Sequence, residues 1–184
     1  MKWLKKIIEF LTGGSKVADK IKTEDKAPEW ALALPWVIIR VHADKYGLDP
    51  KLIAAIIQVE SAGNTYAIRY EKKWSYYFKV PEYAQKIRSS EDTEGTGQAT
   101  SWGLMQVMGT VAREHGFEGW FPELCDPNKG IFYGCAHLDS KLSKYRKMDD
   151  AIAAYNAGSP IKKVDETYVN QYYVDKVMDY YSQL

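Results

Sequence analysis

The stretch LIAAIIQVESAG, residues 52–63, is one of the most apolar runs in the chain, and it ends on a carboxylate. Seven of the eight residues before Glu60 are apolar, and Ile56 and Ile57 precede it by four and three positions. On a helix this spacing places Glu60 on the apolar face. Because Gly63 is typical of a helix end, the stretch predicts a buried helix with a carboxyl group near its C-terminus.

That position predicts a raised pKa for Glu60. Burial disfavours the ionised carboxylate, and the helix C-terminus carries the negative end of the helix dipole. Both effects keep the carboxyl group protonated closer to neutral pH, as a general acid requires. The alternative is a structural glutamate paired with one of the many lysines and arginines of the chain.

Helical patterns surround this stretch. WVIIRVHADKYG is predicted to end at Gly47, after which Asp49 and Pro50 cap and start the next helix. No segment alternates long enough to predict a substantial sheet, so the fold class is mainly α. The further helical segments are TVAREHG at 110–116, residues 127–145 with Asp126 as N-cap, DDAIAAYNAG at 149–158 and VNQYYVDKVMDYY at 169–181.

One long segment lacks a clean helical period. Residues 70–101 end in polar, glycine-containing sequence, and WSYYF at 74–78 indicates a short strand or an aromatic patch. The pattern allows a short β-hairpin within the insertion at 66–100. A loop of this length inside a compact domain is unusual and often functional.

The first 27 residues are predicted to be separate from a folded domain at residues 28–184. In MKWLKKIIEFL, residues 1–11, apolar side chains recur at helical spacing and lysines occupy the other side. The pattern predicts a basic amphipathic helix and a linker, with contact to a membrane surface as one interpretation and packing on the domain as the other. No apolar run reaches the roughly 18 residues of a membrane span, and no signal-peptide cleavage site is evident.

Composition and spacing also limit the partners. A formal net charge of +1 gives no reason to expect nucleic-acid binding, and a monomer is expected. His42, His115 and His137 show no ligand spacing, so neither a metal nor another cofactor is predicted. A helix after residue 126 would place Cys135 on the order of 13 Å along its axis. This exceeds the roughly 7 Å limit for a disulfide with Cys125, so two free thiols are predicted.

Three further motifs follow in order: SWGLMQ at residues 101–106, AAYNAG at 153–158 and YYVDKV at 172–177. Taken alone, each motif is also typical of an ordinary structural element: a turn, a helix end or a core segment. With Glu60 and Ser61, the set resembles the signature of the soluble lytic transglycosylase family of the lysozyme superfamily. That signature is Glu-Ser at a helix end, Gly-Leu-Met-Gln, Ala-Tyr-Asn-Ala-Gly, and Tyr-Val with a valine three residues on.

The resemblance extends from about Pro28 to the C-terminus, and RYE at 69–71 with LCDP…YGC is similar to compact members encoded by phages of Gram-negative bacteria. It implies a lysozyme-like helical fold that cleaves the bond between N-acetylmuramic acid and N-acetylglucosamine in peptidoglycan. Glu60 would be the sole catalytic acid and base and would leave a 1,6-anhydro product, while Ser61 would support the helix end.

The resemblance also implies a set of substrate contacts. Ser101 would lie near the muramic-acid substituent, Met105 and Gln106 would line sugar subsites, and Tyr155 and Asn156 would shape the cleft opposite.

Tyr173 would reach towards the carboxyl group of Glu60. Tyr168 offers a second Tyr-Val dipeptide, but Val177 supplies the expected downstream valine only for Tyr173.

Flat aromatic faces suit pyranose rings, and the insertion is rich in them. Trp74 and Tyr77, with Tyr76 and Phe78, are therefore expected to line or cover one end of the glycan cleft. The alternative is a small satellite core that holds the insertion together.

The chain departs from the family in one respect: 43 residues separate Glu60 from Gly103, roughly twice the spacing of the simplest members. Goose-type lysozymes share the superfamily and hydrolytic members place extra carboxylates in this region. A goose-type muramidase is therefore one alternative, and an idle peptidoglycan-binding virion module is another. The candidate second carboxylates, each expected to be a solvated loop charge, are Glu71, Glu91, Asp92 and Glu94.

Without a clear signal peptide, access to the periplasmic cell wall is expected to depend on a holin-like pore, on packaging in a virion, or on the basic N-terminal helix.

Overall fold

The computed structural model describes residues 27–184, so the helix and membrane contact predicted for residues 1–11 lie outside the described part. Within it, the fold is mainly α, as predicted, and no helix is long and apolar enough to cross a membrane. In chain order the elements are α3 (Glu29–Leu32), α4 (Trp36–Tyr46), α5 (Pro50–Ser61), β1 (Ile68–Tyr70), α6 (Val80–Ile87), α7 (Glu91–Gln98), β2 (Thr100–Trp102), β3 (Val107–Met108), α8 (Gly109–Glu114), the 3-10 helix η1 (Phe121–Cys125), α9 (Pro127–Tyr145), α10 (Met148–Ala157) and α11 (Gln171–Ser182).

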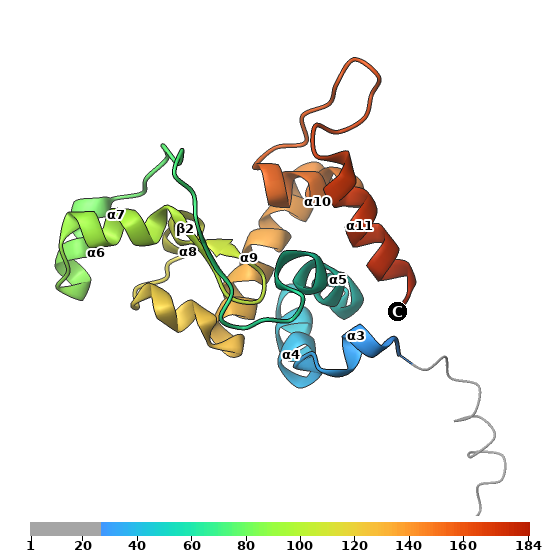
Figure 1. Cartoon of the computed structure of the whole chain (residues 1–184), viewed down its shortest axis with the longest axis horizontal. Helices are drawn as coiled ribbons and strands as arrows, with labels where there is room; N and C mark the ends of the chain where they lie inside the picture. The colour runs from blue at the N-terminus through green and yellow to red at the C-terminus, as the bar shows by residue number, and fades with distance from the viewer. Residues whose placement is uncertain (1–26) are drawn as a thin grey trace, which may run out of the picture.

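Two groups of elements flank the long helix α9 (Figure 1). The small sheet, α6, α7 and α8 lie on one side, and α5, α10 and α11 lie on the other. Helix α9 packs against α4 and α10, while α5 packs against α11. This arrangement leaves the C-terminal end of α5 facing the sheet across the middle of the molecule.

Helix α5 has the predicted bounds. The Asp49 side chain accepts a hydrogen bond from the Lys51 backbone N–H at 2.8 Å and so caps the helix. Residues 52–57 are all buried, because the helix lies between neighbours on every side of this segment. The chain leaves the helix through Ala62 and Gly63, both with left-handed backbone conformations.

The other predicted helices are also present. Gly47 ends α4 with φ +64°, and the Asp126 side chain caps α9 by accepting from the Asn128 and Lys129 backbone N–H groups. Cys135 is buried in α9, and both Cys125 and Cys135 are free thiols, as the helical rise predicted.

The insertion differs from the prediction. Its middle forms two helices, α6 and α7, and residues 74–78 form no strand. The predicted hairpin within 66–100 is also wrong: β1 pairs antiparallel with β2, but both helices lie between them in sequence. The tight hairpin is instead β2–β3, across the Gly-Leu-Met-Gln turn. Two glycines in α7 weaken its helical signal, whereas the Ser90 hydroxyl caps it by accepting from the Thr93 backbone N–H at 3.1 Å.

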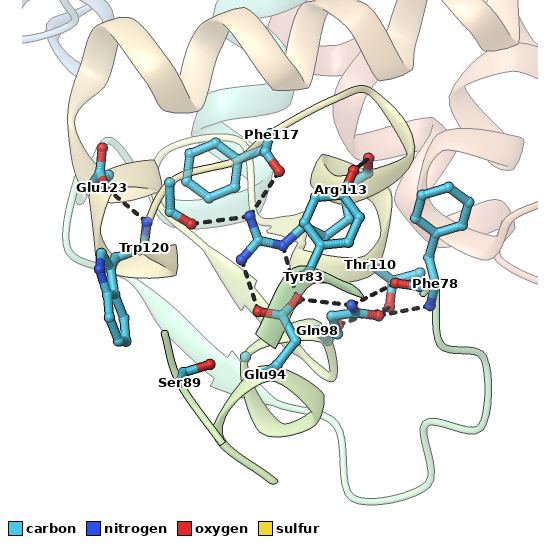
Figure 2. Close-up of polar contacts among 12 residues, drawn as sticks. Phe78, Tyr83, Ser89, Glu94, Gln98, Thr110, Arg113, Phe117, Trp120 and Glu123 are labelled. Carbon is cyan, nitrogen blue, oxygen red and sulfur yellow. Dashed lines mark hydrogen bonds and ion pairs between the residues drawn. The ribbon is translucent and has the colours of Figure 1, made fainter. Parts of the chain in front are cut away.

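A buried ion pair fastens α7 to α8 (Figure 2). Both the Glu94 and Arg113 side chains are fully buried, and the guanidinium donates to the two carboxylate oxygens at 2.8 Å each. Arg113 also donates to the backbone carbonyls of Phe117 and Gly119, and Gln98 donates to Glu94. The expectation that Glu94 is a solvated loop charge is therefore wrong. The pair is bidentate and well satisfied, which is the condition under which a buried charge is tolerated.

Glu94→Ala is expected to lower the free energy of unfolding by about 3–5 kcal/mol, because it leaves the Arg113 guanidinium buried without a counter-charge. Glu91→Ala is the matched control, since it removes an exposed carboxylate from the same first turn of α7 and should cost less than about 1 kcal/mol. Urea denaturation measures both. Equal losses in the two variants would show that the pair contributes nothing beyond the helix dipole.

Candidate active site

An open cleft of about 610 Å³ lies between the two groups of elements. Its lining comes from the end of α5, from β1 and β2, from the insertion, from α8 and α9, and from the end of α10. Glu60 lines this cleft together with four residues of the other sequence motifs, Ser101, Gln106, Tyr155 and Asn156. Segments far apart in the chain are therefore brought to one surface.

Glu60 lies partly buried at the last turn of α5. Burial raises the pKa of its carboxyl group from 4.5 to about 7, while the hydrogen bond from Tyr173 and the positive charge of Arg69 act in the lowering direction. Burial is the largest of the three effects. The raised pKa predicted from the apolar setting of Glu60 is thus present in the structure.

Tyr173 makes the contact predicted for it. Its hydroxyl donates to Glu60 Oε1 at 2.6 Å, and it is carried on α11, which packs against α5. Tyr168, the second candidate, instead donates to Asp150 Oδ1 at 2.6 Å. The choice of Tyr173 by its downstream valine therefore agrees with the geometry.

Two hydroxyl groups hold the Gly-Leu-Met-Gln turn in place through hydrogen bonds to its backbone carbonyls. Ser61 Oγ donates to the Leu104 carbonyl at 2.8 Å, and the Tyr155 hydroxyl donates to the Met105 carbonyl at 2.8 Å. The first of these ties the end of α5 to the turn, so Ser61 supports the helix end as expected. Together the two bonds hold the turn against both α5 and α10.

Met105 does not line the cleft as predicted, because its side chain is fully buried. It packs against α9 at Gly134, where an added Cβ would lie only 2.3 Å from the Met105 sulfur. The methionine therefore anchors the turn in the core, while its neighbour Gln106 lines the cleft.

Gln106 has a left-handed backbone with φ +46° and a fully engaged amide. Its Nε2 donates to the Ala67 and Gly103 carbonyls at 2.8 and 2.9 Å, which uses both amide hydrogens. Its Oε1 accepts from Ser101 Oγ at 3.0 Å. Gln106 and Ser101 thus form a rigid part of the cleft wall.

Asn156, by contrast, is exposed at the end of α10. Its Oδ1 accepts from Asn170 Nδ2 at 3.0 Å, and the residue lines the cleft.

The aromatic segment of the insertion divides between the two predicted roles. Trp74 and Tyr76 line the cleft, whereas Tyr77 and Phe78 do not. The Tyr77 ring lies beside α7, and Phe78 packs against Tyr83 with ring centroids 6.1 Å apart. The structure does not place Tyr77 in the cleft lining as predicted, because its side chain is exposed beside α7 and its hydroxyl donates to the Trp74 carbonyl at 3.3 Å.

Sequence reasoning missed several cleft residues. Arg69 is one of these: it forms an ion pair at 2.6 Å within the lining with Glu71, which was a predicted candidate, and the RYE motif was the available signal. His137 also lines the cleft, and its ring lies 5.9 Å from that of His115, so these two histidines are less scattered than the sequence suggested. Burial lowers the pKa of His137 to about 3, so the ring is neutral. Among residues 27–184, no three His, Cys, Asp or Glu side chains are grouped to hold a metal ion.

The four candidate second carboxylates lie in different places. Glu71 alone shares the cleft with Glu60. Asp92 borders a separate groove beside Trp120, Glu91 is exposed on α7, and Glu94 is buried with Arg113. The insertion therefore offers Glu60 one carboxylate partner.

The model of the family described as "Transglycosylase SLT domain" matches residues 38–173, from α4 to the tyrosine that contacts Glu60. The chain belongs to this family. A protein of Enterobacteria phage PRD1 named "Transglycosylase" is 28% identical over 124 residues, which cover 67% of this chain and 35% of the phage protein. The chain thus matches about a third of the length of that relative.

Glu60→Gln is expected to stabilise the SLT domain at alkaline pH. Because the pKa of Glu60 is higher in the folded than in the unfolded state, wild-type stability from this group is present below pH 4.5 and is lost as pH rises through about 7. The neutral amide avoids that loss. Thermal or urea unfolding should show no difference at pH 4 and an advantage of about 3 kcal/mol for the variant at pH 8. A pH-independent difference would mean that burial does not raise this pKa.

Proposed function

We propose that this SLT domain is a peptidoglycan lytic transglycosylase. It would cleave the β-1,4 bond between N-acetylmuramic acid and N-acetylglucosamine and close a 1,6-anhydro ring on the muramic acid. The observation that carries the proposal is the half-buried carboxyl group of Glu60, with a pKa of about 7, which lines the cleft and accepts a hydrogen bond from Tyr173. The name of the PRD1 relative supports it.

The chemistry needs one group that changes role. Protonated Glu60 donates its proton to the glycosidic oxygen as the bond from that oxygen to carbon 1 breaks, and the substrate's N-acetyl group can stabilise the cationic carbon. The carboxylate then removes the proton from the carbon-6 hydroxyl while that oxygen bonds to carbon 1. The proton returns to Glu60 and no water is consumed. A pKa near ambient pH suits both steps, and the attacking hydroxyl is already tethered.

The neighbours of Glu60 support this cycle. The Tyr173 hydroxyl bonds one carboxylate oxygen and leaves the other for the substrate. Arg69 moderates the pKa, which burial alone would raise further. Ser61 and Tyr155 fix the turn beside the carboxyl group, so the acid and the cleft wall keep one relative position.

Glu71 gives the hydrolytic alternative its one specific observation, since it lines the same cleft and is a candidate base for water. Its carboxylate is paired with Arg69 at 2.6 Å, however, and this contact competes with a bond to water. The transglycosylase reaction requires no second carboxylate, so it accounts for the site with fewer groups.

The setting of the enzyme belongs to the same proposal. We infer that it acts on periplasmic peptidoglycan during phage lysis or wall penetration, as a monomer, with a membrane-surface contact through residues 1–11. The support is the phage relative and the basic amphipathic pattern of the N-terminal sequence.

Digestion of purified sacculi tests the function directly. Wild type should release muropeptides that end in 1,6-anhydro-N-acetylmuramic acid, and mass spectrometry separates these from hydrolysed ends, which carry one water, about 18 Da, more. Glu60→Gln should lower the rate by at least about 100-fold, as loss of a general acid does. Glu71→Gln is the comparison variant and should keep the anhydro product. If wild type produces reducible ends and Glu71→Gln does not, the enzyme is a hydrolase that uses Glu71. Unchanged activity of Glu60→Gln would show that Glu60 is not the catalytic acid.

Tyr173→Phe should move the alkaline limb of the pH–rate profile to higher pH. The hydroxyl lowers the pKa of Glu60, so its removal raises that pKa and keeps the acid protonated further into the alkaline range. Tyr168→Phe removes a hydroxyl from an equivalent hydrogen bond away from Glu60 and should leave the limb unchanged. A shift of the limb to lower pH in Tyr173→Phe would contradict the assigned role.

A further inference from the structure

Thr110 lies where the buried polar network meets the wall of the cleft. It is fully buried in the first turn of α8, and its hydroxyl accepts a hydrogen bond from Trp74 Nε1 at 3.2 Å. The same oxygen lies 3.1 Å from the Tyr76 carbonyl and 3.2 Å from the Gln98 carbonyl. A hydroxyl has one hydrogen, so it donates to one of these carbonyls while accepting from Trp74.

The network behind Thr110 is rigid. Gln98 binds the Phe78 backbone twice, accepting from its N–H at 2.7 Å and donating to its carbonyl at 2.8 Å. Gln98 also donates to Glu94, which is paired with Arg113 (Figure 2). The side chains of Gln98, Glu94 and Arg113 are fully buried, so they form a fixed base under the insertion.

The segment held by this base carries the aromatic wall of the cleft. Residues 71–79 contain no helix or strand, and Trp74 and Tyr76 line the cleft from this segment. Tyr76 has a second anchor on the same helix, since its hydroxyl donates to Glu114 Oε1 at 2.7 Å. Thr110 and Glu114 are one turn apart on α8, so a single helix holds both aromatic side chains.

We propose that Thr110 is a positioning residue for a sugar-binding subsite formed by Trp74 and Tyr76. The flat faces of these rings would pack against pyranose rings of the glycan, and Thr110 would hold the indole in place through its N–H group. The glycan as ligand rests on the proposed function, but the positioning can fail separately. Thr110 touches neither Glu60 nor the reacting bond, so its effect falls on glycan affinity and not on bond cleavage.

Thr110→Val and Thr110→Ser form a matched pair. Valine keeps the shape but removes the hydroxyl, whereas serine keeps the hydroxyl. Calorimetric titration with chitohexaose should show about fivefold weaker binding for Thr110→Val, the effect of one lost hydrogen bond, and binding within about twofold of wild type for Thr110→Ser. On sacculi, Thr110→Val should raise KM and leave kcat unchanged. A lower kcat at unchanged KM, or equal binding by both variants, would overturn the proposal.

A double-mutant cycle with Trp74→Phe shows whether Thr110 acts through the indole. Phenylalanine keeps an aromatic ring but has no N–H group, so Thr110→Val should cause no further loss of chitohexaose binding in the Trp74→Phe background. Additive losses would overturn the proposal. If Thr110→Val does not fold, the comparison of Trp74→Phe with wild type still tests the proposal. Unchanged chitohexaose binding by Trp74→Phe would show that the indole N–H group does not position the ring for the sugar. If the wild-type protein binds chitohexaose but cleaves no peptidoglycan, the proposed function is wrong and the subsite stands. If the wild-type protein does not bind chitohexaose, the proposed subsite is wrong.

Discussion

The hydrogen bond from Tyr173 to Glu60 is the contact on which the arrangement of the site depends. It joins the end of α5 to α11 across 113 residues of chain, and it forms where α11 packs against the buried helix α5. The apolar helix supplies the low-dielectric setting behind the carboxyl group, and the cleft supplies the open side in front. A carboxyl group at a solvated helix end would also be accessible to the substrate, but its pKa would be ordinary.

Three effects balance at that carboxyl group. Burial raises its pKa, while the Tyr173 hydroxyl and the Arg69 charge lower it, and the result is about 7. A fully isolated carboxyl group would hold its proton too firmly to act as a base, and an ion-paired one would lose it too early to act as an acid. The pairing of Arg69 with Glu71 keeps the cation beside the cleft without forming a direct ion pair with Glu60. One residue can then serve in both halves of a reaction.

The elements with strong local signals were predictable from the sequence. Gly47, Asp49-Pro50 and Asp126-Pro127 mark helix ends through their own backbone preferences, so the bounds of α4, α5 and α9 followed from short motifs. Glu60 and Tyr173 were also found, the first from the apolar face and the second from motif spacing. The side-chain direction of Met105 was not, since a motif fixes a position in the chain and not the face on which the side chain lies.

The insertion could not be predicted because its stability comes from distant partners. Helix α7 contains two glycines, and the residue that holds it, Arg113, belongs to another helix. Glu94 therefore looked like a solvated charge. Trp74 and Tyr77 are another case: they are three residues apart in the same aromatic segment, but only Trp74 lines the cleft.

The central claim is that Glu60 holds its proton near neutral pH, and a ¹³C NMR titration of the glutamate carboxyl carbons measures this most directly. The resonance of Glu60 is assigned by its absence from the spectrum of Glu60→Gln. We expect the titration of this carbon to have its midpoint at about pH 7, well above the pKa of 4.5 of an ordinary glutamate. A midpoint near 4.5 would contradict it, because the acid would then be ionised before the reaction begins.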